Sequence, residues 1–247
     1  MIIYEQPLNE KIRLFLRLEL LAKRFRHHLA AESRSDILSA LTLLLELYNL
    51  SARIDLKSDV IKEIDRTSQS VRKVIAGTGK QDETLEILTD HSNLLYQLHG
   101  PLGQHLRSHT FFSSLRQRAS LPGGINGFDI SLLSFWLEKD EAVCIADLKR
   151  WSESYMHTAD AASYLLGLIR NYCDGNEHVA KAGFFQLSLR APYQLLQVEL
   201  PSGMNLYPEI SAGKQRFSLR FVEVDLLADR GKQVDDDVPF RLKLCAF

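Results

Sequence analysis

Two segments of the chain carry residue types at spacings that nucleotide or metal binding would use, and both are incomplete. The run Gly77–Lys80 resembles the end of a phosphate-binding loop. Position 74 is Val and position 81 is Gln, however, so the first glycine and the magnesium-binding hydroxyl are absent. His105 and His109 stand four residues apart, as two ligands on one helical face would, yet no acidic or thiol ligand accompanies them at a recognisable spacing. We therefore expect no metal site and no cofactor.

The sequence also shows no motif of a catalytic nucleophile. The chain contains no G-x-S-x-G elbow, and its cysteines lack the local signature of a nucleophile. Carboxylates that pair only in space leave no trace in a sequence, so an enzyme whose site is assembled from distant residues stays an alternative. The motifs themselves favour a binding protein.

Basic residues near the C-terminus show a clearer pattern. Along Lys214–Phe221 every second residue is apolar, and in a strand these side chains would face the core: Phe217, Leu219 and Phe221. Arg216, Ser218 and Arg220 would then share the opposite face, with the stems of the two arginines about 13 Å apart. Arginine is a preferred anchor at interfaces, but it also serves simply as a solvated strand residue. Both interpretations stay open at this stage.

Other basic positions raise the same question. In the last strand, Arg241 and Lys243 lie opposite the apolar face, and they would join the surface of Arg216 and Arg220 if the two strands are neighbours. On predicted helices, arginine spacing favours solvated faces. These helical arginines are Arg13, Arg17, Arg24, Arg116 and Arg118.

Up to about residue 174 the apolar residues keep helical spacing. The first helix has an apolar surface so broad, with Leu14 and Leu18 on one stripe, that it needs neighbours on two sides, within a bundle or across a dimer interface. We expect Ser35–Asp36 to begin a second helix and Gly77 to end a third. Two separate helices are predicted over about 141–154 and 158–174.

Beyond Gly175 the pattern changes from helical spacing to alternation, as in Leu196–Leu200 and Phe240–Leu244. Helices followed by strands indicate an α+β protein. We predict an N-terminal multi-helix domain over residues 1–180 and a small, mainly antiparallel β domain over residues 181–247. Residues 1–6 are expected to form a strand that joins the β domain.

Composition places the chain among globular proteins of the cytosol. Hydrophobic residues make up 45% and charged residues 25%, and the net charge of -1 gives no global electrostatic preference. The N-terminus lacks signal-peptide features, and no apolar stretch approaches the length of a membrane span. Cys144, Cys173 and Cys245 are odd in number, far apart and in no CxxC pair, which indicates a reducing compartment.

Several blocks of the sequence resemble the ZapD family of cell division proteins. The opening Tyr4–Arg13 is similar to the F/Y-E-x-P-L-N-E-x-x-R start of that family. Further blocks follow in the same order: Lys62–Arg66, Arg116–Gly124, Phe128–Asp129, Leu206–Ser211 and Arg216–Phe221. Several independent blocks in register are more specific than any single motif.

The resemblance implies a non-enzymatic, cytoplasmic homodimer with a helical and a β domain, located at the mid-cell division ring. It implies binding to the C-terminal tail of FtsZ, the tubulin-like GTPase of that ring, and cross-linking of FtsZ filaments. By the same resemblance, Arg216 and Arg220 occupy tail-binding positions, and Arg53 matches a third. We add Lys214 to this expected site, with Arg116, Arg118 and Arg241 as further candidate contacts.

Two further hypotheses concern the first helix. Part of the apolar surface of the first helix, at Leu14 and Leu18, is expected to seal the dimer. The rival of another class is a nucleic-acid-binding helical module that would use the basic face of the first helix. It lacks a basic net charge and aromatic stacking motifs, so we expect no nucleic-acid partner.

Overall fold

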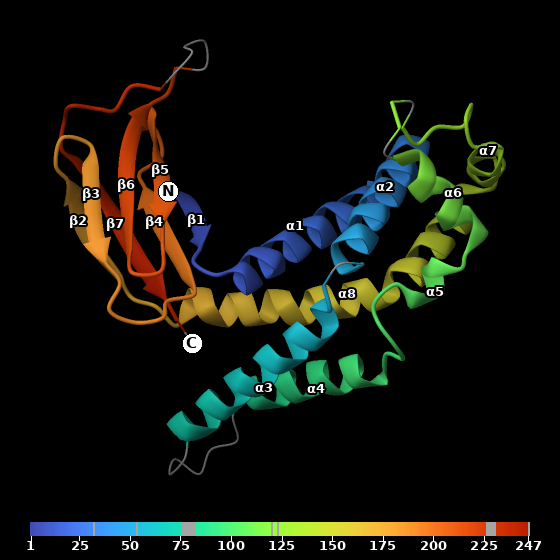
Figure 1. Ribbon diagram of the computed structural model, residues 1–247, viewed down its shortest axis with the longest axis horizontal. Helices are drawn as coiled ribbons and strands as arrows, with labels where there is room; N and C mark the ends of the chain where they lie inside the picture. The colour runs from blue at the N-terminus through green and yellow to red at the C-terminus, as the bar shows by residue number, and fades with distance from the viewer. Residues whose placement is uncertain are drawn as a thin grey trace. The chain divides into compact units, whose positions relative to one another are not determined.

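Helices fill most of the first 171 residues, and six of the seven strands in the described part of the chain follow them (Figure 1). The computed structural model describes residues 1–31, 33–52, 54–75, 83–119, 121–122, 124–225 and 231–246, without the side chains of residues 74 and 75. This order of elements confirms the predicted α+β class. The predicted helix end at Gly77 lies outside the described residues.

The chain divides into two units. The helical unit is Phe15–Leu165, and the β unit combines Met1–Leu14 with Leu166–Phe247. Both boundaries fall inside helices, namely α1 (Glu10–Ala31) and α8 (Glu141–Asn171). The division predicted at residues 180 and 181 would leave β2 (Gly175–Ala180) with the helices, whereas the structure pairs β2 with a strand of the β unit.

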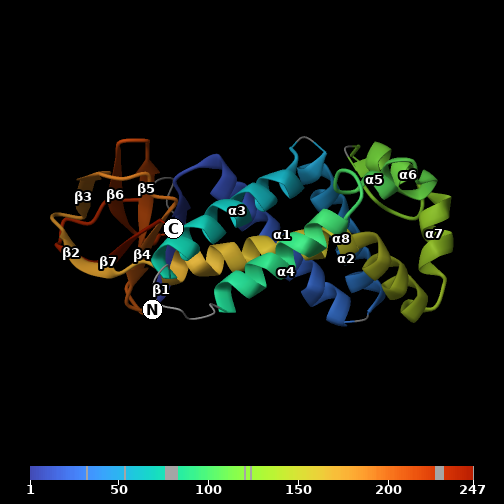
Figure 2. The same ribbon diagram turned by 90° about the horizontal axis from the view of Figure 1, so that it is seen from below.

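Between α1 and α8 the described chain forms α2 (Arg34–Ser51), α3 (Leu56–Ile75), α4 (Glu83–Gln97), α5 (Gln104–Arg107), α6 (Thr110–Ala119) and α7 (Ser131–Leu137). The N-cap of α2 is Ser33, whose hydroxyl accepts a hydrogen bond from the backbone N–H of Asp36 at 3.2 Å. α3 and α4 lie side by side (Figures 1 and 2). Lys57 Nζ donates to the carbonyl oxygens of Leu98 (2.7 Å) and Gly100 (3.0 Å), which follow the end of α4.

α8 corrects the prediction of two helices in this region. It is one helix of 31 residues. Thr158 suggested a helix start because threonine is a good N-cap, but its hydroxyl donates to the carbonyl oxygen of Ser154 at 2.8 Å. Tyr155 is fully buried in the same stretch. The polar group of Thr158 is therefore satisfied inside the helix, and no break is needed.

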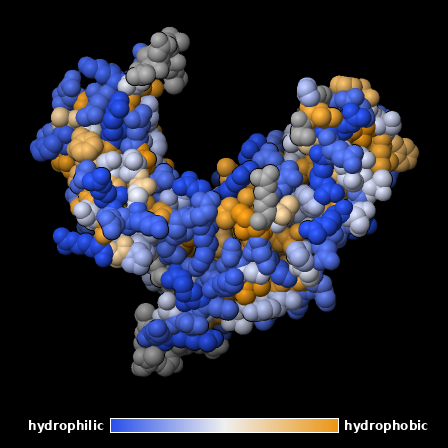
Figure 3. Space-filling model, viewed as in Figure 1, coloured by the Kyte–Doolittle hydropathy of each residue, from blue (hydrophilic) through white to orange (hydrophobic). Residues whose placement is uncertain are grey.

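Exposed apolar residues of the helical unit include a group around α7. Of the two residues expected to seal a dimer, Leu18 is fully buried within the fold and Leu14 is half-buried. Around α7, by contrast, Phe128, Leu132 and Phe135 are exposed, and hydrophobic residues gather there on the surface (Figure 3). No single described helix is long and apolar enough to cross a membrane, although α2 and α3 pass that test of length and composition together, as a bent pair.

The β unit contains two antiparallel sheets, with strand orders β1-β4-β7-β2 and β3-β6-β5. Its remaining strands are β1 (Ile2–Pro7), β3 (Phe184–Ser188), β4 (Leu195–Leu200), β5 (Leu206–Ala212), β6 (Arg216–Glu223) and β7 (Val238–Cys245). Buried residues of both sheets form one core, including Val198 of β4, Leu219 of β6 and Phe240 of β7. The alternation of apolar residues in these three strands therefore reflects one inward face on each.

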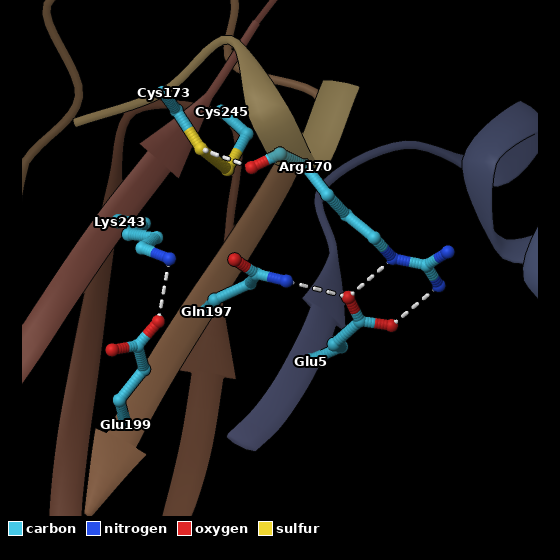
Figure 4. Close-up of polar contacts among 7 residues, drawn as sticks. All are labelled: Glu5, Arg170, Cys173, Gln197, Glu199, Lys243 and Cys245. Carbon is cyan, nitrogen blue, oxygen red and sulfur yellow. Dashed lines mark hydrogen bonds and ion pairs between the residues drawn. A yellow bond between two sulfur atoms is a disulfide. The ribbon is translucent and has the colours of Figure 1, made fainter. Parts of the chain in front are cut away.

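The N-terminal strand is fixed to this unit by a partly buried polar contact. β1 pairs antiparallel with β4, so that Glu5 stands opposite Gln197. Arg170 of α8 donates from Nε and Nη2 to the two carboxylate oxygens of Glu5, at 2.8 and 2.9 Å (Figure 4). Gln197 Nε2 adds a third hydrogen bond at 2.7 Å. A bidentate arginine of this kind sets both the position and the orientation of the carboxylate.

Two of the three cysteines are paired, which their spacing in the sequence did not indicate. Cys173, just after α8, and Cys245, at the end of β7, are joined in a disulfide with their Cα atoms 5.0 Å apart. Their sequence separation of 72 residues hides this proximity from a reading of spacing alone. Cys144 is buried in the helical unit and is free.

The contact between Glu5 and Arg170 should make stability depend on pH. Burial opposes charge on Glu5, but the hydrogen bonds from Arg170 and Gln197, with the charge of Arg170, outweigh it and hold the pKa of Glu5 below its ordinary value of 4.5. A carboxyl whose pKa is lowered by folding stabilises the fold above its unfolded-state pKa. That contribution is lost as the pH falls through the lowered value.

Arg170→Ala is therefore expected to lower the free energy of unfolding by about 2 kcal/mol at neutral pH, because two charge-assisted hydrogen bonds are removed. The difference from wild type should shrink in acid, once the pH falls through the lowered pKa of Glu5 and its carboxyl becomes protonated. Urea unfolding followed by circular dichroism measures both values. Arg190→Ala, an exposed arginine of the same unit, is the control. An effect of Arg170→Ala that is equal at neutral pH and in acid would contradict this assignment.

Candidate peptide-binding face of the three-stranded sheet

The predicted alternation along β6 is confirmed by burial. Phe217, Leu219 and Phe221 are at most 1% exposed and belong to the core between the sheets. Arg216 and Arg220 are exposed, and Ser218 between them is half-buried. The two arginines therefore project from the outer face of the sheet β3-β6-β5, which we call the basic face.

Cross-strand pairing defines the other side chains of the basic face, because directly opposite residues of antiparallel strands point to the same side. Arg220 stands between Phe184 of β3 and Glu209 of β5. Ser188 of β3 stands opposite Arg216. The middle row is polar and uncharged, consisting of Gln186, Ser218 and Ser211.

Arg220 is held in position yet stays available. Its Nη2 donates to the carbonyl oxygen of Gly231 at 3.2 Å, and its Nε lies 3.7 Å from Oε2 of Glu209. Both side chains of this ion pair are nearly half exposed, at 44% and 49%. An exposed pair of this length contributes at most about 1 kcal/mol, so a partner carboxylate can compete with Glu209 for the guanidinium.

Arg216 and Lys214 lie at the turn that enters β6. The backbone N–H of Gly213 donates to the carbonyl oxygen of Arg216 at 2.9 Å and closes this turn. Both cationic side chains are exposed, and among the described residues neither has an ion pair or a side-chain hydrogen bond. Within the described part of the chain, no anionic side chain competes with an external anion for these two charges.

Arg241 and Lys243 do not join this surface, which corrects the expectation that they might. Their strand, β7, belongs to the four-stranded sheet, while β6 belongs to the other sheet. Lys243 Nζ lies 2.6 Å and Arg241 Nη1 4.0 Å from the carboxylate of Glu199, which is 5% exposed (Figure 4 shows Lys243 and Glu199). A buried carboxylate requires such partners, so both cations have a structural explanation.

The two candidate contact residues on α6 differ: Arg116 is engaged in contacts within the helical unit, and Arg118 is exposed. Arg116 donates to the hydroxyl of Tyr48 and to the carbonyl oxygens of Arg107 (3.1 Å) and Phe112 (3.3 Å). Its guanidinium carbon also lies 4.6 Å from the centre of the Tyr48 ring. Arg118 is exposed near the end of α6. Arg53, the third expected tail-binding position, lies outside the described residues.

The histidines that suggested metal ligands have other contacts. His105 Nε2 lies 3.0 Å from the carbonyl oxygen of Trp151, and His109 packs edge-on against Phe112 and Trp151. No cluster of three His, Cys, Asp or Glu side chains able to hold a metal ion is found among the residues that the structure describes. On α1, Arg17 and Arg24 are exposed, as their spacing indicated.

Comparison of the sequence with known proteins identifies the family of the chain. Residues 16–220 match the sequence model of ZapD, described as a cell division protein. The chain is 35% identical over 252 residues to the cell division protein ZapD of Chromobacterium violaceum, with all of both chains covered. It is 37% identical over 254 residues to the protein of the same name from Ralstonia pickettii, again over the full length of both.

The chain belongs to the ZapD family of cell division proteins. The resemblance seen in its sequence blocks is thereby confirmed. The ZapD match ends at residue 220 and so includes both arginines of the basic face. It stops before β7, whose cations belong to the other sheet.

The two side chains that flank Arg220 could not be identified from the sequence alone. Phe184 and Glu209 flank Arg220 only because β3 and β5 pair with β6, and no local pattern reveals which strands are neighbours. A signal for β3 did exist, since Phe185 and Leu187 alternate with polar residues after it. With Phe185 and Leu187 facing the core, this alternation places Phe184 on the outer face.

Arg116 is expected to brace the helical unit. Arg116→Ala should lower the free energy of unfolding by about 2 kcal/mol, because Tyr48 and two carbonyl oxygens lose their donors. Arg118→Ala should change it by less than about 0.5 kcal/mol, because that side chain is exposed. Fluorescence during urea unfolding reports this unit, which holds both tryptophans of the chain, Trp136 and Trp151. Equal effects of the two substitutions would refute the bracing role.

Proposed function

We propose that this ZapD family member is a non-enzymatic cytoplasmic factor that binds the C-terminal tail of FtsZ through its basic face. The observation that carries the proposal is the set of Arg216, Arg220 and Lys214 at one exposed sheet surface. The side chains of Arg216 and Lys214 have no partner among the described residues, and Arg220 has an exposed pair with Glu209 and one hydrogen bond to the carbonyl oxygen of Gly231. Glu209 is the one anion among the cross-strand pairs of this face, so the surface favours an anionic ligand.

The proposed contact consists of charge-assisted hydrogen bonds from the guanidinium groups to carboxylates or backbone carbonyls of the tail. Arg216 and Arg220 lie four residues apart on one strand, which separates their stems by about 13 Å. An extended peptide advances by the same distance over four residues, so two of its acceptors can meet both arginines together. Arg53 is a proposed third contact on the strength of the family resemblance.

Bundling of FtsZ filaments then depends on several weak contacts acting together, and no single site has to bind tightly. Contacts between exposed charges are individually weak and are screened by salt. We propose that the protein acts as a homodimer, which presents two basic faces, while a filament of FtsZ presents many tails. Avidity of this kind exceeds the affinity of either site without any new contact. The proposed outcome is cross-linking of filaments at the mid-cell ring.

Reversal of charge on the basic face tests this function. The double variant Arg216→Glu, Arg220→Glu is expected to abolish pelleting of FtsZ filament bundles, because the face then repels carboxylates. Its circular dichroism should match wild type, since both side chains are exposed. Wild-type protein should also fail to pellet filaments of FtsZ that lacks its tail.

The control is Arg190→Glu, which makes one such Arg-to-Glu charge reversal in the same unit, at an exposed arginine after β3. It should pellet filaments as wild type does. Retained bundling by the double variant, or equal loss with Arg190→Glu, would remove Arg216 and Arg220 from the site.

A further inference from the structure

One aromatic residue on the basic face, Phe184, leaves nearly half of its surface exposed. Phe184 is 46% exposed, whereas its neighbour Phe185 points to the other side and packs against Phe217 and Phe240, with ring centres 6.2 and 5.2 Å apart. Consecutive residues of a strand face opposite sides, so the core uses Phe185 and leaves Phe184 outside. An exposed aromatic side chain beside a charged anchor is typical of interaction sites.

The backbone that carries Phe184 is held firmly. It follows a tight turn in which Ala182 and Gly183 both have positive φ, 47° and 68°, and the N–H of Phe184 donates to the carbonyl oxygen of Lys181 at 3.0 Å. Positive φ at both central residues is typical of the two-residue turns whose twist matches the flanking strands.

Contacts from other segments hold the same turn. Asp237 accepts from the N–H of Ala182 at 3.1 Å and from Lys181 Nζ at 2.5 Å, and Gln233 donates to the carbonyl oxygen of Ala182 at 2.8 Å. The N–H of Phe221 donates to the carbonyl oxygen of Gly183 at 2.8 Å. The ring therefore projects from a fixed backbone, which reduces the entropy lost when a partner covers it.

Phe184 and Arg220 form one recognition element because they stand directly opposite each other on adjacent strands. Strands of a sheet lie about 4.8 Å apart, so an apolar surface and a guanidinium are presented side by side. Arg216 repeats the charge four residues away on β6, where its neighbour on β3 is the small polar Ser188. The basic face is thus asymmetric, with an apolar group at the Arg220 end and none at the Arg216 end.

We infer that Phe184 is an apolar subsite of the basic face, which selects acidic peptides that carry an aromatic or large aliphatic residue next to a carboxylate. The inference rests on the proposed function in placing a peptide on this surface. Carboxylates four residues apart would reach Arg220 and Arg216, and the apolar side chain would cover Phe184 beside Arg220. Charge sets the attraction, and Phe184 sets the choice among acidic peptides.

Two fluorescein-labelled peptides of ten residues test the subsite directly. Each carries two aspartates four positions apart among neutral polar residues, and they differ only in having phenylalanine or serine next to the first aspartate. Fluorescence anisotropy should show that wild type binds the phenylalanine peptide about tenfold more tightly, the effect typical of an aromatic anchor. Phe184→Ser should bind both peptides alike, at the level of the serine peptide. Wild type that fails to discriminate, or Phe184→Ser that still does, would overturn the inference.

Val179→Ser is the matched control. Val179 is 45% exposed on β2, close to Phe184 in the chain but in the other sheet, and its replacement should leave the preference unchanged. Loss of the preference in Val179→Ser would also count against the subsite. Should Phe184→Ser unfold, Phe184→Thr replaces it, because threonine is favoured in strands.

A labelled peptide with the sequence of the FtsZ tail separates this inference from the proposed function. If no variant binds the tail peptide while the preference still depends on Phe184, the subsite stands and the proposed function fails. If Arg216→Glu loses the tail peptide but the preference does not depend on Phe184, the proposed function stands and the subsite is refuted.

Discussion

The inward anchoring of β6 is the constraint on which the candidate site depends. Phe217, Leu219 and Phe221 bury their rings and side chains in the core between the sheets, and each contributes roughly 1.5–3 kcal/mol of burial. A shift of one residue would turn these three side chains to solvent and bring Arg216 and Arg220 into the core. The positions of the arginines are thus a consequence of hydrophobic burial, and any ligand that they bind benefits from a register already set by the fold.

The neighbours of β6 decide what the arginines can do. Glu209 and the carbonyl oxygen of Gly231 orient Arg220, while Arg216 at the opposite end of the strand is unconstrained by any described side chain. The surface therefore combines a preorganised cation with an adaptable one. In the other sheet the cations of β7 surround the buried Glu199 instead. Basic side chains therefore serve two purposes in this unit: those of β6 are proposed to bind a partner, and those of β7 balance the charge of a buried carboxylate.

Much of this could be predicted from sequence where the information is local. Alternation in β6 predicted which side chains face outward, and helical spacing followed by alternation predicted the α+β class. Interactions between distant segments could not be predicted. Nothing near Glu5 indicates Arg170, which lies 165 residues away. Arg116 shows the same limit, because its aromatic partner, Tyr48, lies 68 residues earlier and its spacing on α6 fitted a solvated face as well as a brace.

The pairing of β1 with β4 affects the order in which the chain folds during translation. β1 leaves the ribosome first, yet its hydrogen-bonding partner begins at Leu195 and the arginine that clamps it is residue 170. The helical unit, Phe15–Leu165, is complete before both of them. Pairing over such a sequence distance is slow because a large loop must close first. The N-terminal strand therefore waits unpaired through most of translation, and the four-stranded sheet is the last part of the protein to assemble.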